Sequence, residues 1–205
     1  MEEKKPFQLV AGNTALDFVN TLDNRYAPGG SIELLESYED VLRFASQAGL
    51  IRAAGADQLT RGLAASEARR LLNEAWELRE AMAGVFYSVL EDRPALVMDM
   101  NLLSNAAGAA LARRRLVWVD GGVEWAWCEL EAATPLWMLA EAATRLLNSE
   151  EMALLRACDS PTCRWLFVDT SKNHSRRWCD MKVCGNRIKA RRFYRRERAG
   201  QKRQN

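Results

Sequence analysis

Hydrophobic residues recur at helical spacing through most of the first 150 residues. In the stretch that begins at Ser66, apolar side chains return every three or four positions for about five turns, which predicts a long amphipathic helix. The expected inward positions are Leu71, Ala75, Leu78, Met82, Val85 or Phe86, and Val89. Because this stripe would bury one whole side of the helix, we expect the helix to be central to the fold.

Four shorter stretches predict further helices. One covers residues 13–23, a second begins at a capping signal at Ser37 and stops at Gly49, a third opens at Pro94 and a fourth begins near Pro135. Their expected inward positions include Leu16, Val19 and Leu22 in the first, Leu96, Met100, Leu103, Ala107 and Ala110 in the third, and Leu136, Leu139, Ala143 and Leu146 in the fourth.

Alternating or continuous apolar runs predict small β elements. Residues 7–10 form one short candidate strand, and residues 116–128 form a tryptophan-rich hairpin around Asp120-Gly-Gly. The predicted fold class is therefore mainly α with small β elements, and residues 1–150 form a mostly helical N-terminal domain.

Two cysteine pairs of identical spacing lie in the last fifty residues, Cys158 with Cys163 and Cys179 with Cys184. A zinc ion takes four thiolates in a tetrahedron, and two tight turns that each present two cysteines supply them. Two disulfides need an oxidising compartment, and the chain begins with charged residues and no apolar signal segment, which argues against export. Disulfides and a redox pair remain the alternatives.

A site of four thiolates is coordinatively full, so we expect one structural Zn²⁺ and no catalytic metal. The segment around it is too short to bury a core of its own, so its folding should depend on the metal. We therefore expect Cys184→Ser to release zinc and unfold this segment while the helical body stays intact. Cys128, the fifth cysteine, is expected to be a small buried hydrophobic residue in a reducing cytosol, outside the metal site.

Charge divides the chain unevenly. Residues 156–205 hold 15 of the 29 Lys and Arg and 4 of the 27 Asp and Glu, a formal +11, and the remaining residues are formally −9. A basic tail on an acidic body is expected when one part of a protein meets a polyanion. Residues 186–198 are predicted to form a helix that starts from the last zinc ligand and carries a cationic face.

Between the cysteine pairs, residues 164–170 and 176–179 are predicted to form a hairpin around the turn 171–175. Trp165 and Phe167 have the period of two that places both on one face, where they would form the small core of the module. His174 lies in the polar turn without a second histidine nearby, so we expect a surface residue.

These residues closely resemble the CGNR zinc finger of bacterial proteins. The resemblance covers about 158–195 and includes Cys-Arg-Trp-Leu-Phe-Val-Asp-Thr from Cys163, Arg-Trp-Cys-Asp-Met from Arg177, and Cys-Gly-Asn-Arg from Cys184. It implies a treble-clef-like fold, metal ligation by Cys158, Cys163, Cys179 and Cys184, and DNA binding. In that family the finger follows a domain of the ABATE type, and the proteins are regarded as stress-induced transcription regulators.

Polar residues recur every three to four positions near the N-terminus, at Asp17, Asn20, Thr21 and Arg25. Asn, Asp and Thr often cap local backbone groups, and this is one explanation for them. The run from Leu16 to Arg25 also resembles the opening of the ABATE domain, whose proposed ligand-sensing role makes a small-molecule pocket at these four residues the other explanation.

These observations predict two domains, an ABATE-like domain over 1–150 that senses an effector or dimerises and a nucleic-acid-binding finger over 151–205. The expected function is a zinc-dependent transcription regulator that binds double-stranded DNA. The alternatives are an adaptor that binds RNA or an acidic protein, and an unidentified enzyme with a structural finger. No phosphate loop, His-carboxylate ligand set or hydrolase motif is present, so we expect no enzyme activity.

Cations of the finger are the candidate DNA contacts. The expected phosphate contacts are Lys172, Arg176, Arg177, Lys189, Arg191, Arg192, Arg195 and Arg196. Arg187 or Asn186 would reach a base edge, and for Asn186 a cap or a hydrogen bond that closes the turn is the alternative. No apolar run is long enough to span a membrane, so we expect a cytoplasmic, nucleoid-associated protein. A homodimer is compatible with this function, although no heptad seam requires one.

Overall fold

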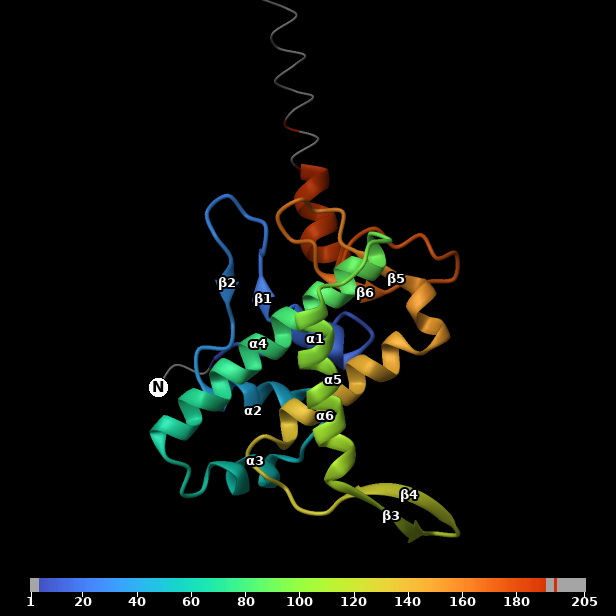
Figure 1. Cartoon of the computed structure of the whole chain (residues 1–205). Helices are drawn as coiled ribbons and strands as arrows, with labels where there is room; N and C mark the ends of the chain where they lie inside the picture. The colour runs from blue at the N-terminus through green and yellow to red at the C-terminus, as the bar shows by residue number, and fades with distance from the viewer. Residues whose placement is uncertain (1–3, 191–193, 195–205) are drawn as a thin grey trace, which may run out of the picture.

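A computed structural model describes residues 4–190 and 194 (Figure 1). The body is helical, with α1 (Thr14–Val19), α2 (Tyr38–Gln47), α3 (Ala53–Thr60), α4 (Ala65–Leu90), α5 (Val97–Ala112) and α6 (Thr134–Leu147). Three two-stranded antiparallel sheets accompany the helices: β1 (Leu22–Asp23) with β2 (Ile32–Glu33), β3 (Arg114–Val119) with β4 (Gly122–Trp127), and β5 (Leu155–Ala157) with β6 (Leu166–Val168). The predicted fold class is confirmed.

The central helix is α4, as its periodicity predicts. Leu71, Ala75, Leu78 and Met82 are buried, but Val89 is 49% exposed, although Tyr87 and Ser88 in the same turn are buried. In α6 all four predicted inward positions are buried. On α5 the prediction is partly wrong. Among the positions predicted to face inward, Leu103 and Ala110 are buried, whereas Leu96 and Met100 are exposed.

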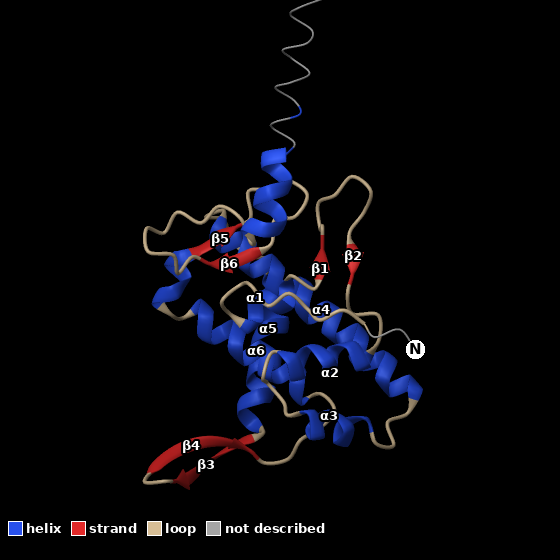
Figure 2. Cartoon of the chain, turned by 180° about the vertical axis from the view of Figure 1, so that it is seen from behind, coloured by secondary structure: helices blue, strands red, loops and turns tan. Residues whose placement is uncertain are grey.

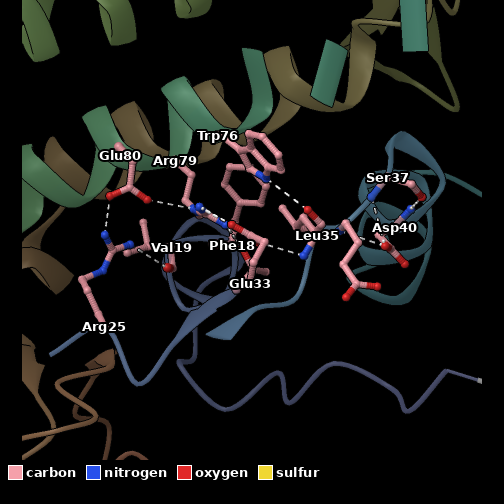
Figure 3. A network of polar contacts seen from close by, with 12 residues as sticks. Phe18, Val19, Arg25, Glu33, Leu35, Ser37, Asp40, Trp76, Arg79 and Glu80 are labelled. Atoms are coloured by element: carbon pink, nitrogen blue, oxygen red, sulfur yellow. Dashed lines mark hydrogen bonds and ion pairs between the residues drawn. The ribbon is translucent and has the colours of Figure 1, made fainter. Parts of the chain in front are cut away.

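The N-terminal segment differs most from its prediction. Residues 7–10 form no strand, and the predicted helix over 13–23 ends at Val19. Beyond it, β1 and β2 form an unpredicted hairpin around Pro28-Gly-Gly. A polar network fixes this hairpin to α4, because the buried Arg79 forms two hydrogen bonds of 2.6 and 2.7 Å with the Glu33 carboxylate (Figure 3). A salt bridge from Arg25 to Glu80 adds a second link between the hairpin and α4.

The predicted tryptophan-rich hairpin is confirmed as β3 and β4. It projects from the end of the body opposite to the finger, as two views of the chain show (Figures 1 and 2). Cys128 is exposed and not buried as predicted, since it lies in the loop that follows β4.

The finger begins after a 3-10 helix, η1 (Glu150–Leu154), and contains β5, β6 and a π-helical turn, η2 (Met181–Gly185), with helical residues 186–190 after it. The predicted hairpin between 164–170 and 176–179 is wrong. β6 pairs instead with β5, with Arg156 opposite Phe167. The Asp169 carboxylate accepts hydrogen bonds from the backbone N–H groups of Ser171 and Arg176, and these bonds turn the chain away from β6.

Body and finger share one hydrophobic cluster. It includes Leu16 and Phe86 of the body together with Leu166, Phe167 and the zinc-site cysteines. Trp165 and Phe167 are buried in it, which confirms their predicted core role. The finger is therefore packed against the helices and is not a separate appendage.

Candidate metal centre and cationic surface

Four cysteines converge on one point of the finger. Cys158 follows β5, Cys163 precedes β6, Cys179 precedes η2 and Cys184 lies within η2. All four are buried, and their Sγ atoms lie within 4.8 Å of one another. The distances from Cys179 Sγ to the sulfur atoms of Cys163 and Cys184 are both 3.6 Å. Zinc–thiolate bonds of about 2.3 Å at tetrahedral angles place sulfur atoms roughly 3.8 Å apart, whereas a disulfide joins them at about 2.0 Å.

The electrostatics of this cluster also favour a cation. Hydrogen bonds from Cys163 and Cys179 lower the pKa of Cys158, while burial raises the pKa of Cys184. Four buried sulfur atoms at such distances cannot all carry negative charge unless a cation lies among them. The site is that of one structural zinc ion, with all four ligands supplied by the chain.

Backbone hydrogen bonds hold the two turns in place. The Cys158 amide donates to Trp165 O at 2.8 Å, and the Asp159 amide donates to Arg177 O at 2.9 Å. At the second turn, the Asp180 carboxylate accepts from the backbone N–H groups of Lys182 and Val183 and so caps η2. The zinc site thereby fixes the start of the helix at residue 186.

Gly185 separates the last ligand from this helix. A Cβ atom at Gly185 would lie 2.2 Å from Met181 Sδ and 3.1 Å from Trp178 Cδ1. The methionine side chain is flexible, but the indole packs against the hydrophobic cluster. The absence of a side chain at Gly185 therefore lets Trp178 pack closely against the turn that carries Cys184.

The predicted DNA contacts divide into three groups. Lys172, Arg177, Arg187 and Lys189 are exposed. Arg177 also pairs with Asp159 at 2.6 Å, and Asn186 is exposed and donates its backbone N–H to close η2. Arg191, Arg192, Arg195 and Arg196 lie outside the described residues.

Arg176 alone forms the third group. Its guanidinium donates to the backbone oxygens of Val10 and Trp178, each at 2.9 Å, and to that of Cys179. It also lies 4.2 Å from the centroid of the Phe167 ring. Sequence reasoning missed this role, because the Val10 carbonyl is distant in the chain. Arg176 joins the metal site to the N-terminal segment, and its donors are largely used within the protein.

The four polar residues near the N-terminus are also engaged within the protein. The Asn20 side chain makes two hydrogen bonds of 2.9 Å with the backbone N–H and C=O of Leu166 in β6. The Thr21 hydroxyl donates a hydrogen bond to Phe18 O and accepts one from Arg79. The Arg25 guanidinium donates to Glu80 and to Val19 O (Figure 3). The backbone amide of Ala11 donates to the buried Asp17 carboxylate. Burial raises the pKa of Asp17 to about 6.

These contacts show how the finger is attached. Two more hydrogen bonds add to those of Asn20. The Val168 amide donates to the Ala11 carbonyl at 2.8 Å, and the Tyr87 hydroxyl donates to Arg164 O at 2.7 Å. Residues on either side of α1, together with Tyr87 of α4, thus bind the backbone of the segment between the cysteine pairs. Local caps and a pocket were the two sequence-based explanations for these polar residues, and the structure adds a third, the attachment of one domain to the other.

Comparison with protein families accounts for most of the chain. Residues 155–197 match the model of the CGNR zinc finger. Residues 12–150 match the ABATE model, described as a putative stress-induced transcription regulator. The chain matches no curated protein. Among the described residues, none of the helices combines the length and the apolar character needed to cross a membrane.

Proposed function

We propose that this chain, which belongs to the ABATE family, is a zinc-dependent transcription regulator that binds double-stranded DNA through its finger. The observation that carries the proposal is the basic segment attached to the metal centre. The zinc site fixes the start of a helix at residue 186, and the sequence from there to 198 holds seven arginines and lysines against one glutamate. DNA binding places the protein in the cytoplasm, at the nucleoid.

In this mechanism zinc supplies shape, and the cations of the finger supply affinity. Lys172, Arg177 and Lys189, with the arginines at 191, 192, 195 and 196, contact phosphates and release counterions from the DNA. Arg187 is exposed at the first turn of the helix, where a bidentate contact with a guanine edge in the major groove becomes possible. The proposal does not depend on Arg176, whose guanidinium is occupied within the protein.

The acidic helical body serves as the effector or dimerisation domain. Its formal charge is opposite to that of the finger, so it is repelled by the DNA backbone and leaves the finger as the contacting surface. Its direct attachment to the finger, through Asn20 and Tyr87, gives it a physical route by which a change in the body would reach the DNA-binding segment.

The test is selection of the zinc-loaded full chain against a random duplex library, followed by affinity measurements across a salt series. We expect enrichment of a defined site and a steep salt dependence. The double variant Arg191→Glu with Arg195→Glu should weaken binding and reduce the slope of log K against log salt by about 2, since each phosphate contact contributes roughly 0.9.

The matched control is Arg69→Glu with Arg145→Glu, two exposed arginines on the body. It makes the same change in net charge away from the finger and should leave the slope near that of the parent. Unchanged affinity in the finger variant would refute the assignment. Equal binding of unrelated RNA and acidic polypeptides, without enrichment of any duplex, would favour the adaptor function instead.

A further inference from the structure

One face of the β3–β4 hairpin is apolar and exposed. The register pairs Leu116 with Trp125 and Trp118 with Val123. Directly opposite residues of an antiparallel pair share a face, as do residues two apart in one strand, so these four side chains lie together. Their exposed fractions are 59% for Leu116, 46% for Trp125, 75% for Trp118 and 56% for Val123. We call this surface the hairpin face.

The base of the hairpin is anchored to the body. Trp127, at the end of β4, stacks on Trp137 of α6 with 6.5 Å between the ring centroids. Arg114 lies opposite Trp127 and pairs with Glu141 of α6. From this base the hairpin projects away from the body, at the end opposite to the finger (Figures 1 and 2). A partner bound to the hairpin face would therefore leave the finger accessible.

Within one chain the hairpin face has little to cover it. The hydrophobic cluster of the described residues includes no residue of β3 or β4. A two-stranded hairpin is only marginally stable in water, and the apolar face of a sheet is normally covered by another strand or helix. Contiguous exposed apolar residues of this size mark a surface that binds a partner. The hairpin face therefore indicates an interaction site.

The area and the charge of the hairpin face fit a second copy of the chain. Its four side chains offer roughly 500 Å², so two copies would bury about 1,000 Å², near the lower limit for a specific interface. None of the four is charged, and Arg114 at the base is already paired with Glu141. By the register, the exposed Arg115 and Glu124 lie on the opposite face. Two hairpin faces can therefore meet without burying an unpaired charge.

The large and small side chains of the hairpin face are arranged in a self-complementary way. The two tryptophans lie on one diagonal of the four positions, and the leucine and the valine lie on the other. A twofold axis that crosses the strands between the two residue pairs places Trp118 of one copy over Leu116 of the other. The same axis places Trp125 over Val123. Each large side chain thus meets a smaller one.

The position of the body selects this axis. A twofold axis along the strands would also place large side chains over small ones, but it would stack the base of one hairpin on the base of the other. The two bodies would then meet, because each body lies at the base of its hairpin (Figures 1 and 2). The axis that crosses the strands sends the bodies to opposite ends.

We propose that the hairpin face binds the hairpin face of a second copy, so that the chain forms a twofold-symmetric dimer through β3 and β4. This inference goes beyond DNA binding by the finger and assigns dimerisation to a defined surface of the body. The aliphatic side chains of each copy cover the tryptophans of the other. The dimer forms without DNA, so it stands or fails independently of the proposed function.

Sedimentation equilibrium of the zinc-loaded full chain without DNA tests the proposal. An interface of this size should give a dissociation constant on the order of 10 µM. Trp118→Glu places a charge in the interface and should weaken self-association at least about tenfold. The matched control is Val119→Glu, a similar change at an exposed residue of the same strand but on the opposite face, and it should associate like the parent. Circular dichroism checks that both variants keep the helical fold.

A mixture of two variants tests which residues face each other. Leu116→Lys alone should also weaken self-association about tenfold. Mixed in equal amounts, Trp118→Glu and Leu116→Lys should associate with each other at least about tenfold more tightly than either does with itself, because opposite charges then meet across the axis. No recovery in the mixture would overturn the predicted facing of positions 116 and 118.

Other results would overturn the dimer itself. A parent chain that stays monomeric up to about 1 mM would show that the hairpin faces do not bind each other. If such a monomer bound vesicles of neutral lipid and lost this binding in Trp118→Glu, the hairpin face would be a membrane contact instead. Equal losses in Trp118→Glu and Val119→Glu would place the contact at a strand edge, and a dimer unaffected by either variant would place it elsewhere on the chain.

Discussion

At the residue scale, Asn20 shows what a sequence pattern can and cannot give. The helical spacing of Asp17, Asn20 and Thr21 marks them as unusual, because polar side chains seldom recur on a short apolar helix. The partner of Asn20 could not be predicted, since Leu166 lies 146 positions away and its pairing with β5 was itself missed. The zinc ligands, by contrast, were identified because their spacing is local and their chemistry is specific.

Replacement of Asn20 tests whether its two hydrogen bonds with Leu166 hold the finger against the body. Asn20→Ala leaves the backbone N–H and C=O of Leu166 buried without partners, so we expect the free energy of unfolding to fall by about 2–4 kcal/mol. Urea unfolding of the zinc-loaded protein measures it. The control Asn101→Ala changes an exposed residue of α5 and should stay within about 0.5 kcal/mol of the parent. A similarly small loss at Asn20 would mean that the two hydrogen bonds do not hold the finger.

Asp17 gives a pH dependence with a defined sign. Burial raises the pKa of its carboxyl from the ordinary value of 3.8 to about 6, so the folded chain binds more protons than the unfolded chain between these values. The resulting stabilisation is present at low pH and is lost as the pH rises through about 6. Asp17→Asn removes this loss. Between about pH 5 and pH 7.5, the stability of the variant relative to the parent should rise by about 1–2 kcal/mol.

Denaturant unfolding at both pH values, with zinc content checked at each, measures this difference. Asp57→Asn, a change at an exposed residue of α3, is the matched control. A constant difference between Asp17→Asn and the parent across the window would contradict a raised pKa in the folded state.

At the element scale, local periodicity decided which predictions succeeded. The helices α4 and α6 and the β3–β4 hairpin were predicted because their patterns are complete within one stretch of sequence. The β1–β2 hairpin was missed because its strands have two residues each, too few to show alternation. In the finger, the burial of Trp165 and Phe167 was correctly predicted, but Leu166 and Val168 are buried as well. The strand β6 pairs with a strand before the first cysteine, and period alone does not name a partner.

The role of Gly185, between the last zinc ligand and the basic helix, can be tested by comparing its replacement by alanine with the same replacement at Gly108. At Gly185 a methyl group meets Trp178, so Gly185→Ala should lower the free energy of unfolding by about 1–3 kcal/mol and weaken zinc retention. Gly108 lies within α5, and a Cβ atom there meets nothing within 4 Å. Gly108→Ala should therefore raise stability by about 0.5–1 kcal/mol, the gain in helix propensity.

Thermal unfolding of both variants and a competition assay with a chelator measure these effects. Similar stabilisation by both alanines would show that Trp178 moves aside without cost. In that case Gly185 would not be required for the packing of Trp178 against the turn that carries Cys184.

At the scale of the whole molecule, composition suggests that the finger and the body are independent domains, whereas their packing shows that they share a core. The formal charges of +11 and −9 and the two family matches separate a finger from a body. Yet one hydrophobic cluster contains residues of both, and Asn20, Tyr87 and Arg176 join their backbones. The sequence could not show this, because the contact surfaces carry no motif. It predicted that loss of zinc would leave the body intact, and the shared core leads us to expect otherwise.

Removal of zinc decides between these expectations. Chelation of the full chain should lower the thermal midpoint on the order of 10 °C, and the body helices should melt together with the finger in one transition. Calorimetry, with circular dichroism of the helical signal, follows both parts. Cys184→Ser should show the lowered midpoint without chelator, and Cys128→Ser, a change at the exposed fifth cysteine, should match the parent. Two separate transitions, with the main one unmoved by chelation, would mean that the body folds independently of the metal. A single transition would mean that the state of the metal site is felt throughout the helices, through the same contacts that would carry an effector signal to the finger.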